Sequence, residues 1–251
     1  MKKKILISII ITYYKKRKFI NQTIQSILNQ SYKNFELILV YDDNNRDELK
    51  YIRKLLGNIK RKKIIINSKN LGVAKSRNIA IKRSKGTYLA FIDSDDLWKK
   101  NKLLNQLNYM HQNGFHFSFT SYGIINEKNK IIGKREVFID ANYKELYNSN
   151  FIGLNTVMVH KKLFSKLIFP PLKTQEDYAL WLKLARQGFK LKHLNQNLSF
   201  WRKSKNSLSS NVFQKLFDAF KLYYIYEKKN FIFSIYSVLV LSYNKLIKKF
   251  N

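Results

Sequence analysis

YLAFIDSDD, residues 88–96, is the segment that decides the fold. Its first five residues are apolar, aromatic or β-branched, which predicts a buried strand. Three carboxylates follow the strand at once, on Asp93, Asp95 and Asp96. Burial at a strand end and mutual repulsion would raise their pKa values, and a hard divalent cation would relieve that repulsion. The pattern predicts a site for Mn²⁺ or Mg²⁺; the alternative is a polar turn in which Asp96 caps a helix that begins near Trp98.

Strands and helices alternate on the N-terminal side of this segment. Runs rich in β-branched and aromatic residues predict strands at Ile5–Thr12, Phe35–Tyr41, Lys63–Asn67 and Tyr88–Ile92. Helical spacing predicts helices around Ile20–Leu28, from about Asp47, and over Val73–Arg83. This alternation predicts an α/β fold with a mostly parallel sheet flanked by helices.

Polar residues stand at the ends of three predicted strands. Thr12 and Tyr13 end the first strand, and Asp42 and Asp43 close the second. Ligands of parallel α/β sheets bind beyond the carboxyl ends of the strands, so we expect these residues to converge with residues 93–96. A carboxylate at 42 or 43 can accept a hydrogen bond from a nucleobase or a ribose hydroxyl; the alternative is a turn with an N-cap.

Beyond residue 113 the pattern is less regular, with short strand-like runs and one amphipathic helix that ends at Gly188. Glu176 and Asp177 open this helix, either to complement its dipole or as a general base on a rigid element. Arg77 could contact a phosphate or pair with the strand-end carboxylates. Arg202 could neutralise a departing diphosphate or simply add to a basic chain.

Composition limits the classes of protein to which the chain can belong. Lys and Arg number 48 against 16 Asp and Glu, which gives a formal net charge of +32. Such a charge attracts polyanions: nucleic acid, an anionic membrane face or a phosphorylated substrate. The chain has no cysteine, which excludes disulfides and thiolate metal sites and suits a cytoplasmic protein. We read the Lys-led N-terminus as the entry to a buried strand, because its apolar run lacks a cleavage site.

The C-terminal region, residues 211–251, is predicted to form a helical appendage rich in aromatic residues and Lys. Its most apolar run, Phe231–Tyr243, is too short to span a membrane and precedes Lys245, Lys248 and Lys249. An amphipathic helix flanked by Lys can lie in an anionic membrane interface. The alternative is that these helices pack on the preceding domain or on a partner subunit.

Together these segments resemble the family-2 inverting glycosyltransferases of GT-A fold, whose sheet is Rossmann-like. The matching segments are SIIITY (8–13), VYDDNNRD (40–47), NLGVAKSRN (70–78), GTYLAFIDSDD (86–96) and QEDYALW (175–181), with weaker echoes in FWR (200–202) and NSLS (206–209). The family usually has proline and asparagine where this chain has Ile11 and Tyr14, and Gly-Ser where it has Asn44-Asn45. These departures remove no carboxylate and bear on the donor rather than on activity.

The resemblance implies a catalytic domain over 1–210, with a nucleotide-binding part (about 1–96) and an acceptor part (97–210). It implies transfer with inversion from a nucleotide-diphosphate sugar, with a UDP-sugar favoured, to a hydroxyl of a glycan or lipid-linked acceptor in polysaccharide or lipopolysaccharide synthesis. The expected catalytic residues are Asp177, as base, and Glu176. The expected donor-binding residues are Thr12, Tyr13, Asp42, Asp43, Arg77, Asp93, Ser94 and Arg202, and the expected metal ligands are Asp95, Asp93 and Asp96.

Two other classes compete with this interpretation. A basic nucleic-acid-binding α/β protein would suit the net charge, but clustered strand-end carboxylates repel phosphate, so we expect no nucleic acid. A sugar nucleotidyltransferase would share the metal carboxylates, but it normally has a glycine-rich loop where this chain has TYYKK, residues 12–16. We expect a cytoplasmic enzyme that lies peripherally on the inner face of the cell membrane if its C-terminal helices bind lipid.

Overall fold

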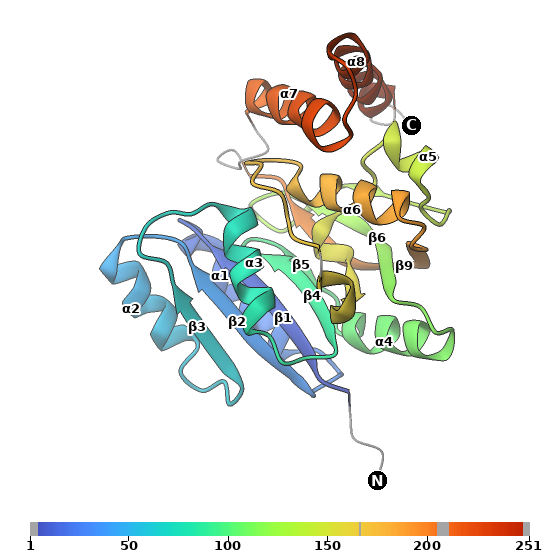
Figure 1. Ribbon diagram of the computed structural model, residues 1–251. Coiled ribbons are helices and arrows are strands. Elements are labelled where there is room, and N and C mark those ends of the chain that lie inside the picture. The colour runs from blue at the N-terminus through green and yellow to red at the C-terminus, as the bar shows by residue number, and fades with distance from the viewer. Residues whose placement is uncertain (1–4, 166, 205–210, 248–251) are drawn as a thin grey trace.

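A nine-stranded sheet with helices on both faces forms the framework of the protein (Figure 1). The computed structural model describes residues 5–165, 167–204 and 211–247. The strand order is β3-β2-β1-β4-β8-β6-β9-β5, and β7 pairs with β6. The predicted segments at residues 1–4, 206–209 and 248–251 lie outside the described residues.

The N-terminal half has the predicted alternation of strands and helices. Its four strands, β1 (Ile7–Tyr13), β2 (Phe35–Tyr41), β3 (Lys62–Ile66) and β4 (Tyr88–Asp93), are parallel to one another. The connecting helices are α1 (Arg17–Leu28), α2 (Arg46–Leu55) and α3 (Val73–Arg83). The carboxyl ends of β1, β2 and β4 are therefore neighbours along one edge.

Alternate residues of the central strands face two separate hydrophobic cores. Ile9 and Ile11 of β1 join the core that contains the buried faces of α1 and α4 (Lys102–Gln112). Ile10, between them, joins the core that contains α3 and α6 (Glu176–Arg186). This two-residue period is the geometry of a strand covered on both faces, and it fixes which helices lie on each side.

The second half of the sheet is mixed. β8 (Met158–His160) is antiparallel to both β4 and β6 (Phe117–Ile125). β6 runs parallel to β9 (Lys192–Arg202) and antiparallel to β7 (Ile131–Arg135). Between these strands lie α5 (Tyr143–Tyr147) and two short 3₁₀ helices, Leu154–Thr156 and Lys161–Phe164.

The helix expected near Trp98 begins later than predicted. Residues Leu97–Trp98 form the short edge strand β5, antiparallel to β9, and α4 begins at Lys102. The Trp98 indole is buried, and its Nε1 donates to the carbonyl of Asn155 over 2.8 Å. Pairing with a strand a hundred residues away thus overrides the local capping pattern, and Asp96 caps no helix.

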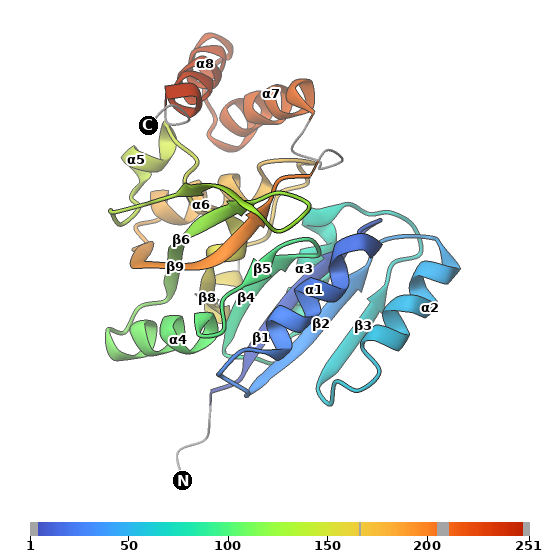
Figure 2. The same cartoon turned by 180° about the vertical axis from the view of Figure 1, so that it is seen from behind.

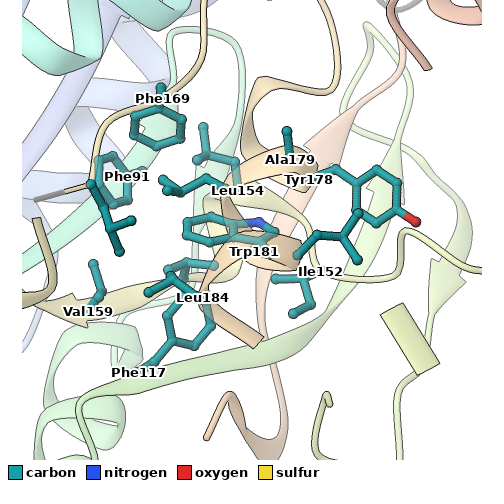
Figure 3. Close-up of a cluster of buried hydrophobic side chains, with 14 of the residues drawn as sticks. Phe91, Phe117, Ile152, Leu154, Val159, Phe169, Tyr178, Ala179, Trp181 and Leu184 are labelled. Carbon is teal, nitrogen blue, oxygen red and sulfur yellow. The ribbon is translucent and has the colours of Figure 1, made fainter. Parts of the chain in front are cut away.

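A compact aromatic cluster fixes α6 against the sheet (Figure 3). Trp181 of α6 has no exposed surface, and its ring meets the Phe117 ring edge-on with centroids 5.0 Å apart. Phe169, in the segment before α6, packs against both Trp181 and Phe91 of β4. Buried aromatic contacts of this kind hold the helix, and hence its N-terminal carboxylates, rigidly relative to the end of β4.

The C-terminal helices pack on α5 and α6, at the end of the molecule remote from β3 (Figures 1 and 2). They comprise α7 (Val212–Lys221), a π-helical turn (Leu222–Tyr226) and α8 (Phe231–Ile247). Tyr223 is fully buried and donates to the carbonyl of Tyr147 over 2.6 Å. Within the described residues, the helices are too short or too polar to cross a membrane.

Gly86, between α3 and β4, gives a test of the packing around β1. A Cβ atom at this position would lie 2.5 Å from the backbone nitrogen of Ser8. We expect Gly86→Ala to lower the free energy of unfolding by about 1–3 kcal/mol, because the backbone of β1 must shift. Urea denaturation measures the loss. Gly133→Ala is the matched control, since its nearest neighbour would be a side-chain carbon at 3.7 Å; an equal loss in both variants would contradict the steric argument.

Candidate active site

The loop after β4 places Asp93 and Asp95 in different surroundings. The Asp93 side chain is 39% exposed, and its Oδ1 lies 2.7 Å from a guanidinium nitrogen of Arg77. The Asp95 side chain is 12% exposed, and its Oδ2 lies 2.7 Å from Lys16 Nζ. Desolvation raises the pKa of Asp95, Lys16 opposes this, and the charge of Asp93 adds to it. The two carboxylates therefore repel one another, and each keeps one oxygen outside these ion pairs. Ser94, buried between them in sequence, shares this loop.

Asp96 has a different role from its neighbours. Its Oδ1 accepts a hydrogen bond from the backbone of Arg202 over 2.8 Å, and its Oδ2 accepts one from Asn155 Nδ2 over 2.7 Å. The residue is 1% exposed, and burial raises its pKa well above the ordinary aspartate value. Because both oxygens are engaged inside the protein, the structure favours a fixing role for Asp96 over the metal ligation expected from the sequence.

Asp42, at the end of β2, organises the turn before α3. Its Oδ1 accepts hydrogen bonds from Asn67 Nδ2 over 2.7 Å and from the backbone of Leu71 over 2.8 Å. Its Oδ2 accepts one from the backbone of Gly72 over 2.9 Å. Gly72 has a φ of 82°, a conformation that glycine adopts without strain. The carboxylate thus joins the ends of β2 and β3 to the start of α3.

Asp43 joins the ends of β1 and β2. Its Oδ1 accepts from the backbones of Asn44 and Asn45, and its Oδ2 accepts from the backbone of Lys15 over a longer 3.3 Å. Asp42 and Asp43 are 4% and 3% exposed, so both are held in place before any ligand arrives. Of the two, Asp43 has the weaker internal bond on one oxygen and is the better candidate for reading a nucleobase.

Thr12 and Tyr13 differ in accessibility. Thr12 pairs with Asp93 in the β1–β4 register and is partly exposed. The Tyr13 ring has no exposed surface, stacks on Tyr41 with centroids 5.5 Å apart, and donates its hydroxyl to Glu48. The Tyr13 side chain thus belongs to the core, which corrects the expectation that it contacts the donor; only its backbone lies at the strand end.

Arg77 of α3 connects the two halves of the site. One guanidinium nitrogen lies 2.7 Å from Asp93 Oδ1, and another pairs with Glu176 Oε1 at the start of α6. The guanidinium is 3% exposed and lies 5.5 Å above the Phe169 ring. Of the two roles open for Arg77 in the sequence, the structure shows pairing with carboxylates.

Glu176 and Asp177 lie beside this guanidinium. Burial raises the pKa of Glu176 to about 7, with Arg77 opposing and Asp177 adding to the rise. Burial also raises the pKa of Asp177, and the charge of Asp93 adds to it while Arg77 opposes. Asp177 is partly exposed, and its Oδ1 accepts from the backbone of Tyr178 over 2.7 Å. Asp177 is thus the one of the pair that both faces solvent and holds a proton more tightly than an ordinary aspartate.

Arg202, at the end of β9, is a buried clamp. It is 1% exposed, and its Nε donates to the carbonyl of Asp95 over 2.7 Å. Its terminal nitrogens donate to Asn126, Asn129 and Gln22 over 2.6–3.0 Å. Every guanidinium nitrogen therefore donates to a group inside the protein. In the structure Arg202 holds the loop at residues 95–96, whereas the sequence led us to expect a contact with the departing diphosphate.

Three residues of the site carry no signal in the sequence that singles them out. Lys16 is one of many lysines, yet it forms the ion pair with Asp95. Asn155 lies in an irregular segment and fixes Asp96. Burial raises the pKa of the Tyr122 hydroxyl of β6; Asp96 and Asp177 lie close enough for their charges to add to the rise, while Arg135 opposes it. Only tertiary folding brings these side chains to the end of β4.

The donor set at the end of β4 fits a divalent cation that completes its shell with substrate oxygens. No group of three His, Asp or Glu side chains among the described residues forms a ready-made metal site. Mg²⁺ and similar hard cations commonly take one or two carboxylates and fill the remaining positions with water and phosphate. Asp93 and Asp95 are the candidates for such a pair, since each has one oxygen outside its ion pair.

The match to known proteins agrees with this arrangement of strands and carboxylates. The model of the family described as "Glycosyl transferase family 2" matches residues 8–169. The chain belongs to glycosyl transferase family 2. The resemblance stated from the sequence segments is thereby confirmed, and the protein is a glycosyltransferase.

Two relatives of this glycosyltransferase match it over most of its length. The UDP-Glc:alpha-D-GlcNAc-diphosphoundecaprenol beta-1,3-glucosyltransferase WfaP of Escherichia coli is 36% identical over 214 residues, which cover 84% of this chain and 82% of WfaP. An uncharacterized glycosyltransferase of Haemophilus influenzae is 35% identical over 246 residues, 97% of each chain.

Solved structures of low sequence identity share the fold of this glycosyltransferase. TarS 1-349 of S. aureus, in complex with UDP-GlcNAc, superposes with a TM-score of 0.71 at 18% identity, covering 94% of this chain and 71% of TarS. The mannosyltransferase PcManGT of Pyrobaculum calidifontis, in complex with GDP-Man and Mn²⁺, gives 0.71 at 12% identity, covering 96% and 74%. The predicted GT-A fold is thereby confirmed.

The Arg202 clamp predicts a large effect of a conservative substitution. Arg202→Lys leaves several buried acceptors without a donor, and each such group costs about 1–3 kcal/mol. We expect the free energy of unfolding to fall by at least about 2 kcal/mol, measured by urea denaturation. Arg61→Lys, at an exposed position that donates to Asn34, is the matched control and should stay within about 0.5 kcal/mol of the unsubstituted protein. An equal fall in the free energy of unfolding in both variants would show that the bonds of Arg202 do not stabilise the fold more than those of an exposed arginine.

Proposed function

We propose that this glycosyltransferase is metal-dependent and moves a sugar, with inversion, from a UDP-sugar to a hydroxyl of a lipid-linked glycan. The observation that supports this most directly is the Arg77 bridge, which sets Asp93 of the strand end and Glu176 of α6 around one buried guanidinium. Through this bridge the proposed donor side lies close to Asp177, the proposed base: the charge of Asp93 contributes to the raised pKa of Asp177, which burial mainly causes.

The donor is assigned from the relatives and from the strand ends of this chain. TarS has been solved with UDP-GlcNAc, and WfaP is named for its UDP-Glc donor. In this chain the ends of β1 and β2 carry Thr12 and Asp43, one partly exposed and the other pre-positioned by backbone amides. A carboxylate held in this way accepts hydrogen bonds from a uracil N–H or a ribose hydroxyl without reorganising.

Asp93 and Asp95 would hold Mn²⁺ or Mg²⁺. A divalent cation there would stabilise the negative charge of the departing diphosphate. The desolvation that raises the pKa of Asp95 makes its ionised form costly in the free protein, so Asp95 gains from any nearby cation. Lys16 provides part of that positive charge in the structure.

Asp177 would take the proton of the acceptor hydroxyl. A general base works best when its pKa lies near the working pH, and burial shifts the pKa of Asp177 in that direction. Arg77 and Glu176 hold the first turn of α6 in place, so the base stays at a fixed position relative to Asp93. A base on one side of the anomeric carbon and a leaving diphosphate on the other give inversion.

The acceptor is proposed to be lipid-linked and the site of action an anionic membrane face. WfaP acts, by its name, on a diphosphoundecaprenol acceptor, and it covers most of this chain. The net charge of +32 favours association with an anionic surface. These two points support the proposal that the enzyme acts in envelope polysaccharide synthesis at the inner face of the cell membrane.

Metal-dependent UDP binding tests the donor site. We expect titration calorimetry to show that the unsubstituted protein binds UDP in the presence of Mn²⁺. The Asp95→Ala variant should bind UDP at least about tenfold more weakly, because the cation loses a carboxylate ligand. Asp47→Ala is the matched control: its side chain is 82% exposed on α2, and it should bind like the unsubstituted protein. Absence of UDP binding in any metal would overturn the uridine assignment, and retention on DNA would then favour the nucleic-acid-binding alternative.

Asp177→Asn tests the base. The amide keeps an oxygen that can accept from the Tyr178 backbone but cannot take a proton, so we expect kcat to fall by about 10²–10⁴-fold with UDP affinity unchanged. Because the base acts in its deprotonated form, the rate should fall as the pH drops below its raised pKa. The acidic limb of the kcat/KM profile should therefore lie above the ordinary range of aspartate. An unchanged kcat in Asp177→Asn would remove this residue from the chemistry.

A further inference from the structure

The C-terminal helices present an apolar surface of unusual extent. Fifteen of the 23 large hydrophobic side chains that are exposed among the described residues lie between Val212 and Ile247. Phe213 of α7 is 87% exposed and Ile232 of α8 is 77% exposed. A concentration of exposed apolar side chains in one segment of this kind favours an interaction site. We call the exposed side chains of residues 212–247 the outer surface.

The charges of the outer surface have one sign. Asp218 is 2% exposed and accepts hydrogen bonds from the backbone and the hydroxyl of Thr174, both over 2.9 Å. Glu227 is 5% exposed, accepts from the Tyr143 hydroxyl over 2.6 Å and pairs with Arg186. Both acids of residues 211–247 are thus turned inward. The remaining charged side chains of this segment are lysines, and none of them is buried: Lys215, Lys221, Lys228, Lys229 and Lys245.

A cavity of about 430 Å³ opens beside these lysines. Its lining combines Lys228 and Lys229 with Tyr147 of α5 and with Phe233 and Tyr236 of α8. Lys229 Nζ lies 5.5 Å above the Tyr147 ring, while Phe233 and Tyr236 are more than half exposed. Cationic nitrogens next to exposed aromatic rings suit a phosphate that is attached to an apolar chain.

Helix α7 is joined to the turn that carries the proposed base. Thr174 donates to Asp218 of α7, and Gln175 Nε2 donates to the carbonyl of Lys215 over 3.2 Å. These two residues immediately precede Glu176 and Asp177. The inner side of α7 is therefore attached to the turn before the proposed base, and part of the outer surface lies on the same helix.

We propose that the outer surface docks into the interface of a bilayer of anionic phospholipid, with a headgroup phosphate in the cavity at Lys228 and Lys229. This inference rests on the proposed function and names the membrane contact that it requires. The helices would lie in the plane of the interface, apolar side chains inward and lysines toward the headgroups. A second copy of the chain fits less well, because a twofold interface would set lysines against lysines.

Vesicle flotation tests the proposal with two sets of vesicles, phosphatidylcholine alone and phosphatidylcholine with phosphatidylglycerol. We expect binding to the anionic vesicles that weakens with added salt. The double variant F213D/I232D, altered only at exposed positions, should lose binding by at least about tenfold. The matched control is Ile131→Asp, 69% exposed on β7, which should bind as the unsubstituted protein does.

The lysines are tested separately. K228E/K229E should weaken binding to anionic vesicles by about tenfold or more, since each lysine near such a surface contributes to binding. K54E/K60E makes the same change of net charge at exposed positions outside the outer surface and should have a much smaller effect. Equal effects of the two double variants would show that net charge alone drives binding and would overturn the headgroup site.

UDP binding measured on the same variants separates this inference from the proposed function. F213D/I232D should bind UDP and Mn²⁺ as the unsubstituted protein does, because neither residue belongs to the donor site. UDP binding without any vesicle binding would overturn the membrane inference alone. A dimer in solution that F213D/I232D dissociates, again without vesicle binding, would overturn it in favour of a second copy of the chain.

Discussion

The buried guanidinium of Arg77 is the interaction on which the arrangement of the site depends. It neutralises Asp93 at the end of β4 and Glu176 at the start of α6, two residues that are 83 positions apart in the chain. Glu176 is buried, and a buried carboxylate without a partner costs several kcal/mol, so Arg77 stabilises the first turn of α6 beside the end of β4. The aromatic cluster around Trp181 supplies the rigidity, and Arg77 supplies the electrostatic compatibility (Figure 3).

Arg202 acts on the same loop from the other side. Its backbone and side chain hold Asp96 and the carbonyl of Asp95, while Asn155 takes the remaining oxygen of Asp96. The two arginines thus divide the strand-end carboxylates by function. Asp96 is engaged inside the protein, whereas Asp93 and Asp95 each keep one oxygen outside their ion pairs. Because the loop is already fixed, it would lose little conformational entropy if a donor bound to these oxygens.

The C-terminal helices have two chemically distinct sides. On the inner side, polar groups are paired with the catalytic part: Asp218 with Thr174, Glu227 with Arg186, Tyr223 with Tyr147. On the other side, the described residues between Val212 and Ile247 expose aromatic and aliphatic side chains, and the lysines of this segment are not buried. The inner contacts explain why these helices pack on the catalytic part, and the exposed side chains explain why a bilayer is their proposed partner. Of the alternatives considered for this region from the sequence, the structure shows packing on the preceding domain, and the membrane interface stays a proposal.

From the sequence alone it was possible to predict the strands and helices of the N-terminal half, the sheet edge that carries the candidate site, and the family. Period and composition act locally, and the matching segments are contiguous, so both can be read without a structure. The tertiary structure alone decided how the carboxylates and arginines share their roles. Asp96, Tyr13 and Arg202 look available in the sequence, but long-range partners bury them: Asn155 and Arg202 for Asp96, Tyr41 and Glu48 for Tyr13, and Gln22, Asn126 and Asn129 for Arg202. Burial and pairing depend on residues far apart in the chain, and no local pattern encodes them.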